Sequence, residues 1–202
     1  MARSREFDED VVLDAAMEYF WSWGYEATSV RDLIEATGLT GASLYNAFGD
    51  KRGLFRAALD RYVESSIGER IRRCAALPPR DAIASFFDDI LRRSLTDRQR
   101  KGCMLVNSAL EIAPHDLELR KVIAAVLSRI EAFFVGCIEA GQAQDTITSS
   151  MPAQSIARHL LGVLMGVRVL ARVRPERALL EGVVVPALAL LDGPDVRAAR
   201  VQ

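Results

Sequence analysis

The stretch Thr37–Lys51 constrains the fold of this chain more than any other. Gly38 accepts a positive φ and can end a helix, and Thr40 is a suitable N-cap for a second helix. Gly49 would end that second helix after about two turns. The apolar residues of this stretch can turn inward: Leu39, Leu44 and Phe48. Its other residues are left facing outward: Thr40, Gly41, Ser43, Tyr45 and Asn46. Two helices joined by a Gly-containing turn, with an exposed face on the second, are typical of a helix-turn-helix.

An ordinary helical hairpin uses the same kind of turn and is the alternative interpretation. Tyr45 favours the helix-turn-helix, because a phenol on the solvent side of a short helix is poorly explained by packing. It is well explained as a group that meets a phosphate or a base edge.

The rest of the chain also has helical patterns, and no β-branched alternation is long enough for a strand. A first helix is expected over about 8–23, with Leu13, Ala16, Phe20 and Trp23 as one apolar stripe. Asp50 would cap a long helix that runs from Lys51 into the region of Arg70, and the pair Pro78-Pro79 would turn the chain. Further helices are expected over about 81–95, 102–112, 116–140, 152–173 and 175–191, followed by a frayed tail over 195–202.

The net charge of the N-terminal segment bears on whether the partner is DNA or another protein. The whole chain has a net charge of −1. The first 52 residues hold ten acidic residues and five basic ones (Arg3, Arg5, Arg31, Lys51 and Arg52), a net charge of −5, whereas a DNA-binding segment usually has a basic footprint. DNA affinity would then depend on a few placed contacts and on helix N-termini. The same charge leaves open a helical sensor that binds a partner protein instead of DNA.

The sequence holds little that suggests an enzyme. The two histidines, His115 and His159, fall in different segments with no metal-type spacing, and no glycine-rich phosphate loop is present. An enzyme is therefore the weakest alternative, and we expect no metal and no cofactor. The three cysteines, Cys74, Cys103 and Cys137, are an odd number without pairing, which indicates reduced thiols. With no apolar run of membrane length and no secretory signal, a cytoplasmic protein is expected.

The first quarter of the chain holds a dense set of short motifs: Ala15-Ala16, Phe20, Gly24-Tyr25, Thr28-Ser29-Val30, Ala36–Thr40, Ser43–Lys51 and Leu54-Phe55. On these residues the chain resembles the TetR family of transcriptional repressors, and Gly102–Glu111 resembles the ligand-binding half of one branch. The resemblance implies an all-α fold, with a three-helix helix-turn-helix domain over residues 1–52. A long helix would join it to an all-helical effector-binding and dimerisation domain over 53–202. The implied function is a homodimeric repressor of an inverted repeat in double-stranded operator DNA, released by a small apolar or reactive effector.

The resemblance also implies roles for single residues at the DNA. Phosphate contacts are expected from Thr28, Ser29 and Lys51, and a position at the groove edge from Arg31. The major groove would receive Thr40, Gly41, Ala42 and Ser43. Contacts to the DNA backbone or to a base would come from Tyr45 and Asn46. Many members have a basic residue and then Gly before Ser-Leu-Tyr, where this chain has Gly41-Ala42. Contacts at the head of the recognition helix must therefore be apolar or made by the backbone, such as Ala42 against a thymine methyl.

Dimerisation is expected through the helix over 152–173. Gly162 and Gly166 would let two helices approach closely, and Leu161, Met165 and Val169 could form an apolar seam. Packing within one chain is the alternative use of these residues, and the resemblance favours the dimer. A twofold pair would hold its two recognition helices roughly 34–36 Å apart, about one turn of DNA.

A mostly apolar effector cavity is expected in the C-terminal domain. Its lining would come from Phe86, Phe87, Ile90, Cys103, Met104, Asn107, Phe133, Phe134 and Cys137, with Asn107 as the polar anchor. Plain core packing is the alternative for each of these apolar residues. Cys103 follows Gly102 at a helix start and comes after Arg98, Arg100 and Lys101, which favours a reactive thiolate, as in relatives that sense reactive compounds. The alternative is a small buried side chain that packs the helix start.

Overall fold

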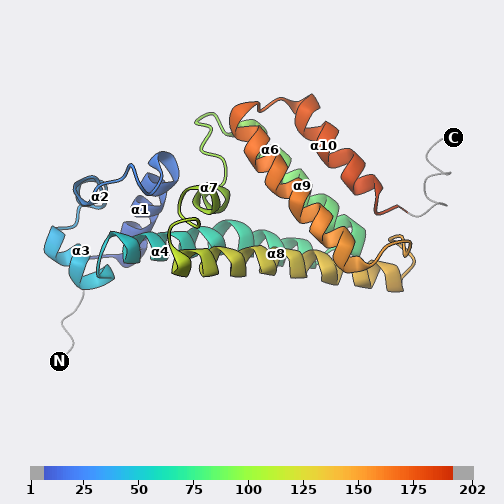
Figure 1. The fold of residues 1–202 in the computed structure, drawn as a ribbon, viewed down its shortest axis with the longest axis horizontal. Coiled ribbons are helices and arrows are strands. Elements are labelled where there is room, and N and C mark those ends of the chain that lie inside the picture. Colours follow the sequence, from blue (N-terminus) through green and yellow to red (C-terminus); the bar gives the residue numbers. More distant parts are fainter. Residues whose placement is uncertain (1–6, 193–202) are drawn as a thin grey trace. The chain divides into compact units, whose positions relative to one another are not determined.

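The computed structural model of the chain describes residues 7–192. Every regular element in that range is helical, which confirms the all-α prediction (Figure 1). The chain forms two compact units. Within the described range, the first comprises residues 7–67 and 103–123 and the second comprises 68–102 and 124–192. The predicted arm residues Arg3 and Arg5 and the predicted frayed tail over 195–202 lie outside the described residues.

The first unit contains the predicted three N-terminal helices. Its elements are α1 (Glu9–Trp23), α2 (Val30–Thr37), α3 (Gly41–Phe48), α4 (Lys51–Tyr62), α7 (Met104–Glu111) and the start of α8 (Leu117–Ala143). Helix α1 begins at Asp8, whose carboxylate accepts a hydrogen bond from the backbone N–H of Asp10 at 3.0 Å. It ends at Gly24, whose φ of 85° lies in the region that favours glycine.

Packing of α1 corrects one part of the predicted stripe. Val12, Ala16 and Phe20 are the buried residues of α1, and the ring of Phe20 meets that of Phe55 edge-on at a centroid distance of 5.0 Å. The prediction that Trp23 faces inward is wrong, because its side chain is 66% exposed. The buried positions of α1 recur every four residues, and Trp23 is the last residue of the helix and does not continue that series.

The predicted long helix after Asp50 is present, but it is not α-helical throughout. Helix α4 passes into a π-helical turn, η1 (Val63–Gly68), and then into α5 (Glu69–Ala75). Within this turn the hydroxyl of Ser66 donates to the backbone carbonyl of Tyr62 at 2.9 Å. Such a side-chain bond competes with the regular ladder, which gives a local reason for the wider turn.

The second unit is built around α6. Its helices are α5, α6 (Pro79–Thr96), α9 (Ala153–Val173), α10 (Arg177–Ala189) and residues 124–143 of α8. Helix α6 packs against α5, α9 and α10. It begins at Pro79, where a fixed φ suits the first helical position, so the proline pair acts as the predicted corner. Buried residues include Ile83, Phe87, Phe134, Leu160 and Leu180.

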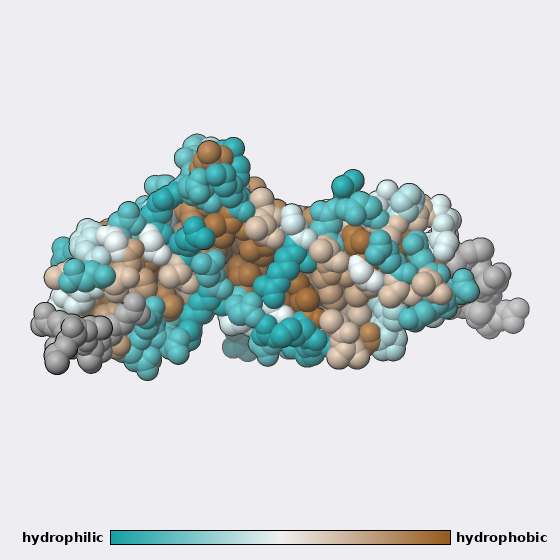
Figure 2. Space-filling model, turned by 90° about the horizontal axis from the view of Figure 1, so that it is seen from below, coloured by the Kyte–Doolittle hydropathy of each residue, from teal (hydrophilic) through white to brown (hydrophobic). Residues whose placement is uncertain are grey.

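Large apolar side chains also reach the surface. Val11, Trp23, Leu110, Val173 and Val185 are each at least 60% exposed. Figure 2 shows one face of the molecule, on which brown apolar areas interrupt a largely teal polar surface. Among residues 7–192, no helix combines the length and the apolar character needed to cross a membrane.

Candidate nucleic-acid interface

Helices α2 and α3 form a helix-turn-helix with capped ends. Ser29 caps α2 in a reciprocal arrangement with Asp32: the Ser29 backbone N–H donates to the Asp32 carboxylate at 2.8 Å, and the Asp32 N–H donates to the Ser29 hydroxyl at 3.2 Å. The bonds from Ser29 hold the pKa of Asp32 below its ordinary value. Gly38, in the left-handed region with φ 71°, ends α2, and Thr40 caps α3 by accepting from the Ser43 N–H at 3.1 Å.

The two faces of α3 are divided as the sequence predicts. Leu44 is fully buried and Leu39, just before the helix, is 7% exposed. Thr40, Ala42, Tyr45 and Asn46 are exposed, whereas Gly41, Ser43 and Phe48 are half-buried. The Tyr45 side chain is 50% exposed and lies on the face that Leu44 does not use. An exposed phenol on a capped two-turn helix is the arrangement expected of a recognition helix.

The hydroxyls at the head of α3 already interact with each other. The oxygens of Thr40 and Ser43 lie 2.9 Å apart. Because a hydroxyl has one donor and two acceptor sites, each of them keeps capacity for at least one further partner. Both side chains therefore fix the start of α3 while retaining a hydrogen-bonding group at its tip.

At the start of α2 the structure corrects one predicted contact. Thr28 is only 1% exposed and its hydroxyl donates to the backbone carbonyl of Gly24 at 2.6 Å. The structure does not support a phosphate contact by this side chain, because the hydroxyl is buried and already used within the loop. Ser29 and Arg31, the other two residues predicted here, are exposed.

At the start of α4, Lys51 lies beside an aromatic ring. Asp50 caps the helix by accepting from the Gly53 N–H at 2.7 Å. The ammonium of Lys51 lies 4.2 Å from the centroid of the Tyr25 ring, a cation–π contact that fixes its position next to the helix N-terminus. Lys51 is thus half-buried. Burial raises the pKa of Tyr25, so its phenol stays neutral.

Ion pairs within the first unit change the meaning of the acidic count. The guanidinium of Arg61 on α4 bonds Asp14 at 2.5 Å and Asp10 at 2.6 Å. The hydrogen bond from Arg61 lowers the pKa of Asp14. Two of the ten acidic residues counted among the first 52 are therefore paired with a cation outside that segment, whereas Arg52, one of the five basic residues, is paired with a carboxylate outside it.

Two carboxylates from beyond residue 100 complete the first unit. The Glu111 carboxylate, at the end of α7, accepts from the backbone N–H of Tyr25 at 3.2 Å and from that of Glu26 at 2.9 Å. A Cβ added to Gly24 would lie 3.0 Å from the same carboxylate. No local sequence pattern predicts this contact. In the sequence, Glu111 stands out only as the last residue of the stretch that resembles the ligand-binding half of the family.

The second of these carboxylates belongs to Asp116. It bonds Arg52 at 2.5 Å and 2.8 Å in a two-pronged pair. It also accepts the backbone N–H groups of Glu118 and Leu119 at 2.9 and 3.0 Å, at the start of α8. The guanidinium of Arg52 holds the pKa of Asp116 far below its ordinary value. Arg52 is thereby fixed to the α7–α8 connection.

The residues predicted to bind an effector fall into both units. Cys103, Met104 and Asn107 belong to the first, and the six others belong to the second. Cys103 occupies the N-cap position of α7, close to the predicted helix start, but it is only 6% exposed and lies 3.5 Å from the Tyr62 hydroxyl. This burial favours the alternative of a packed thiol over that of an accessible nucleophile.

In the second unit the phenylalanines pack on one another. Phe87 and Phe134 stack at a centroid distance of 5.8 Å, and Phe86 meets Phe134 edge-on at 5.2 Å. Phe86, Phe87, Ile90 and Phe134 are each at most 2% exposed. This arrangement is that of a packed core and does not support a cavity at these four positions. Phe133 is half-buried at the edge of the cluster.

Phe133 and Cys137 do line a cavity. Its volume is about 340 Å³, and its other lining residues are mostly apolar: Ala75, Leu77, Pro79, Ala132, Gly136 and Ala140. Burial raises the pKa of Cys137 to about 11, so its thiol is protonated at neutral pH. These two residues remain candidates for an apolar ligand, and Cys137 is an inert member of the lining.

The residues predicted for the dimer lie away from the core of the second unit. The buried face of α9 consists of Ala153, Ile156, Ala157, Leu160, Leu164, Val167, Arg168 and Ala171. Gly162 and Val169 are exposed, whereas Leu161, Met165 and Gly166 are half-buried. A Cβ added at either glycine would meet nothing within 4 Å. Three of the five residues are thus partly covered within the same unit, and the dimer seam stays a prediction.

The described residues contain no set of side chains suited to bind a metal ion. Between residues 7 and 192, no three His, Cys, Asp or Glu side chains gather in a way that could hold a metal ion.

Comparisons with known proteins identify the same family at both ends of the chain. Residues 12–58 match the bacterial regulatory proteins of the tetR family, and residues 79–184 match the tetracyclin repressor-like C-terminal domain.

Two curated relatives match along most of their length. Over 196 residues, the chain is 31% identical to the uncharacterized HTH-type transcriptional regulator YezE of Bacillus subtilis (strain 168), covering 95% of this chain and 100% of YezE. It is also 31% identical over 172 residues to the HTH-type transcriptional repressor ComR of Escherichia coli (strain K12), covering 84% of this chain and 82% of ComR.

A solved structure supports the assignment. A cysteine mutant of the TetR family transcriptional regulator CifR, complexed with 26-base-pair double-strand operator DNA, has a TM-score of 0.83 and 32% identity to this chain. The match covers 94% of this chain and 100% of that one. The family consists of regulators and not of enzymes, so the enzyme alternative is set aside. Relatives of this similarity span nearly the whole chain and share its helix-turn-helix, and the chain belongs to the TetR family of DNA-binding transcriptional regulators.

Proposed function

We propose that the chain acts as a dimeric repressor, which binds an inverted repeat in double-stranded operator DNA and leaves it when a small-molecule effector binds. The observation that carries the proposal is the exposed face of α3, where Ala42, Tyr45 and Asn46 stand clear of the core. The relative ComR is a named repressor, and CifR is described in complex with operator DNA. A protein that acts on the chromosome would work in the cytoplasm.

In this proposal α3 enters the major groove. Ala42 has only a methyl group, which suits a thymine methyl, while Tyr45 and Asn46 can bond a base edge or a phosphate. The N-termini of α2 and α4 turn their partial positive charge towards the DNA backbone, with Ser29 and Lys51 at those ends. Because positions 41 and 42 have no cation, these placed contacts supply the affinity.

The dimer of the proposal uses the outer face of α9. Gly162 and Gly166 allow a second helix to approach closely, and Leu161, Met165 and Val169 supply apolar contact. A twofold axis makes such a contact self-complementary, because each residue meets the same surface of the partner. It would also set the two copies of α3 about one turn of DNA apart, roughly 34–36 Å.

The effector of the proposal is small. The apolar cavity beside Phe133 and Cys137, of about 340 Å³, lies within the size range of ligand pockets. Within the first unit, α7 is linked to the DNA-binding helices, since its last residue, Glu111, bonds the loop ahead of α2. A displacement of α7 would therefore pull on the Tyr25 and Glu26 backbone. The burial of Cys103 favours a non-covalent effector.

Selection of bound fragments from random double-stranded DNA tests the proposal directly. We expect an enriched inverted repeat whose half-sites lie about one helical turn apart. Sedimentation of the complex should give two chains for each repeat. Failure to enrich any DNA, with a folded protein, would contradict the proposal and favour the sensor that binds a partner protein.

Substitutions then test the interface residues. Tyr45→Ala should weaken operator binding about tenfold, which corresponds to about 1.4 kcal/mol. Lys51→Ala should weaken it and lower the salt dependence by about one phosphate contact. Lys121→Ala is the matched control, because this exposed lysine pairs with Glu118 on α8 and should leave DNA binding unchanged. Wild-type affinity in both test variants would refute the assignment of α3 and α4 to the interface.

A further inference from the structure

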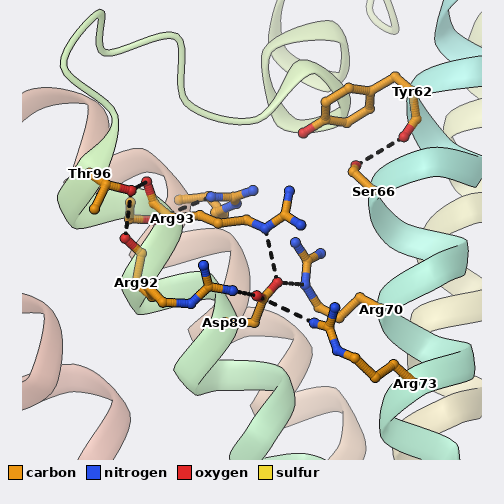
Figure 3. A network of polar contacts seen from close by, with 10 residues as sticks. Tyr62, Ser66, Arg70, Arg73, Asp89, Arg92, Arg93 and Thr96 are labelled. Atoms are coloured by element: carbon orange, nitrogen blue, oxygen red, sulfur yellow. Dashed lines mark hydrogen bonds and ion pairs between the residues drawn. The ribbon is translucent and has the colours of Figure 1, made fainter.

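The second unit contains an unusual group of charges around one carboxylate. Asp89 of α6 is surrounded by Arg70 and Arg73 from α5 and by Arg92 and Arg93 from its own helix (Figure 3). One carboxylate oxygen lies 2.7 Å from Nε of Arg70 and 3.1 Å from Nε of Arg93. The other lies 3.3 Å from Nη2 of Arg73 and also bonds Arg92. We call these five residues the arginine cluster.

Positive charge exceeds negative charge in the arginine cluster. Four guanidinium groups meet one carboxylate, an excess of three positive charges. The acids nearby do little to offset it, since Glu181 is paired with Arg177 at 2.7 Å and Asp88 is exposed to water. Guanidinium groups this close repel one another unless anions stand between them. The cluster is therefore short of negative charge.

The arginine cluster is also short of hydrogen-bond acceptors. A carboxylate has about four lone-pair sites, and the four arginines already use them. Asp89 is 5% exposed and Arg70 is 2% exposed, and the Nη2 group of Arg70 is buried without any hydrogen-bond partner. Behind it, the Arg70 guanidinium lies 5.4 Å from the centroid of the Phe86 ring. The arginine cluster therefore has more N–H donors than Asp89 can accept from.

A cavity lies beside the cluster. Its volume is about 730 Å³, and it is lined by residues of α5, α6 and α10: Arg73, Ser85, Asp88, Asp89, Leu91, Arg92, Leu95, Thr96, Arg177 and Glu181. This size suits a small metabolite. The side chains of Arg73 and Arg92 are 50% and 67% exposed, so their guanidinium groups are accessible to a ligand there. Hydroxyl groups of Ser85 and Thr96 add polar contacts.

We propose that the arginine cluster is a binding site for a small multiply charged anion, bearing carboxylate or phosphate groups. Arginine's planar fork of N–H donors matches both groups and can bond two of their oxygens at once. Arg73 and Arg92 bind the ligand from the cavity, while Asp89 and the buried Arg70 hold them in position. A ligand with two or three negative charges would offset most or all of the three excess positive charges, whereas an apolar compound would offset none of them. This site is separate from the apolar cavity at Phe133, and its occupation does not require DNA.

Titration calorimetry of the full chain without DNA tests this proposal. The two probes are citrate and inorganic phosphate, each added at constant ionic strength against a chloride background, and they distinguish carboxylate from phosphate ligands. We expect saturable binding of at least one probe. Arg73→Gln and Arg92→Gln should each weaken that binding at least tenfold, and added salt should weaken it further because exposed charges are screened.

Arg158→Gln is the matched control. This arginine is 69% exposed, pairs with Glu131, and belongs to the same unit outside the arginine cluster. Circular dichroism and thermal unfolding establish that all three variants fold. Absence of saturable binding by both probes would overturn the proposal. So would equal affinity in wild type, Arg73→Gln and Arg92→Gln, or an equal loss in the control.

Discussion

Removing the Glu111 carboxylate tests the link between α7 and the loop ahead of α2. In Glu111→Ala the backbone N–H groups of Tyr25 and Glu26 lose their acceptor, at 3.2 Å and 2.9 Å respectively. The Tyr25 bond is half-buried, whereas the Glu26 bond is exposed and water can replace the carboxylate there. The variant should therefore lose stability, with most of the loss arising at Tyr25.

The magnitude follows from these two bonds and one opposing effect. A hydrogen bond to a charged group contributes about 1.5–3 kcal/mol, and the exposed bond contributes the smaller share. Glu111 is the last residue of α7, where a negative charge meets the negative end of the helix dipole at a cost of about 0.3–1 kcal/mol. Alanine relieves that cost. The expected net loss is about 1.5 kcal/mol of the free energy of unfolding.

Urea unfolding followed by tryptophan fluorescence measures this loss in the right unit, because Trp21 and Trp23 both lie in α1. With a slope of about 2–3 kcal/mol/M, the midpoint should fall by roughly 0.5–0.7 M. Glu35→Ala is the matched control, since Glu35 is an exposed carboxylate in the last turn of α2. It relieves the same dipole cost without removing the loop contact. Equal midpoints for wild type and Glu111→Ala would refute the reasoning.

Three further predictions concern titration and thiol chemistry. Arg52 holds the pKa of Asp116 below its ordinary value, so the stability it contributes is present above about pH 4 and is lost as pH falls further. The free energy of unfolding should therefore fall less steeply with decreasing pH in Asp116→Asn than in wild type. The Cys137 thiol, with a pKa of about 11, should react slowly with iodoacetamide at pH 7.5 and faster between pH 9 and 11, as measured by mass spectrometry. A mild thiol reagent should leave the operator complexes of wild type and Cys103→Ser equally intact, and release of wild type alone would instead identify a reactive effector.

The helix-turn-helix could be predicted because its signals are local. Ser29, Thr40 and Asp50 cap their own helices, and Gly38 and Gly49 end them, so each boundary depends on residues a few positions apart. The buried and exposed faces of α3 follow from the same short segment. Local sequence is sufficient wherever the interaction is itself local.

The features that sequence reasoning missed depend on distant residues. Arg61 pairs with Asp10 and Asp14 from another helix, and Glu111 reaches the loop at Tyr25 across 86 positions of the chain. Spacing along one helix cannot reveal such partners. A series of phenylalanines indicates burial without telling a packed cluster from a lined cavity, so the sequence could not separate the buried Phe86 and Phe134 from Phe133, which lines a cavity. Asp89 and its arginines went unnoticed, since charged residues at helical spacing usually face water.

The Glu111 and Asp116 contacts also bear on protein engineering. A hybrid regulator would join the DNA-reading segment of one repressor to the sensing segment of another, and the domain boundary expected from the sequence would place the cut near residue 52. In this chain such a graft would separate Arg52 from Asp116 and the Tyr25 and Glu26 amides from Glu111. A graft that keeps the donor's α7 and the start of α8 together with its first four helices would preserve these bonds. The portable module is therefore discontinuous in sequence, and exchange of this module between relatives requires three matched crossovers instead of one.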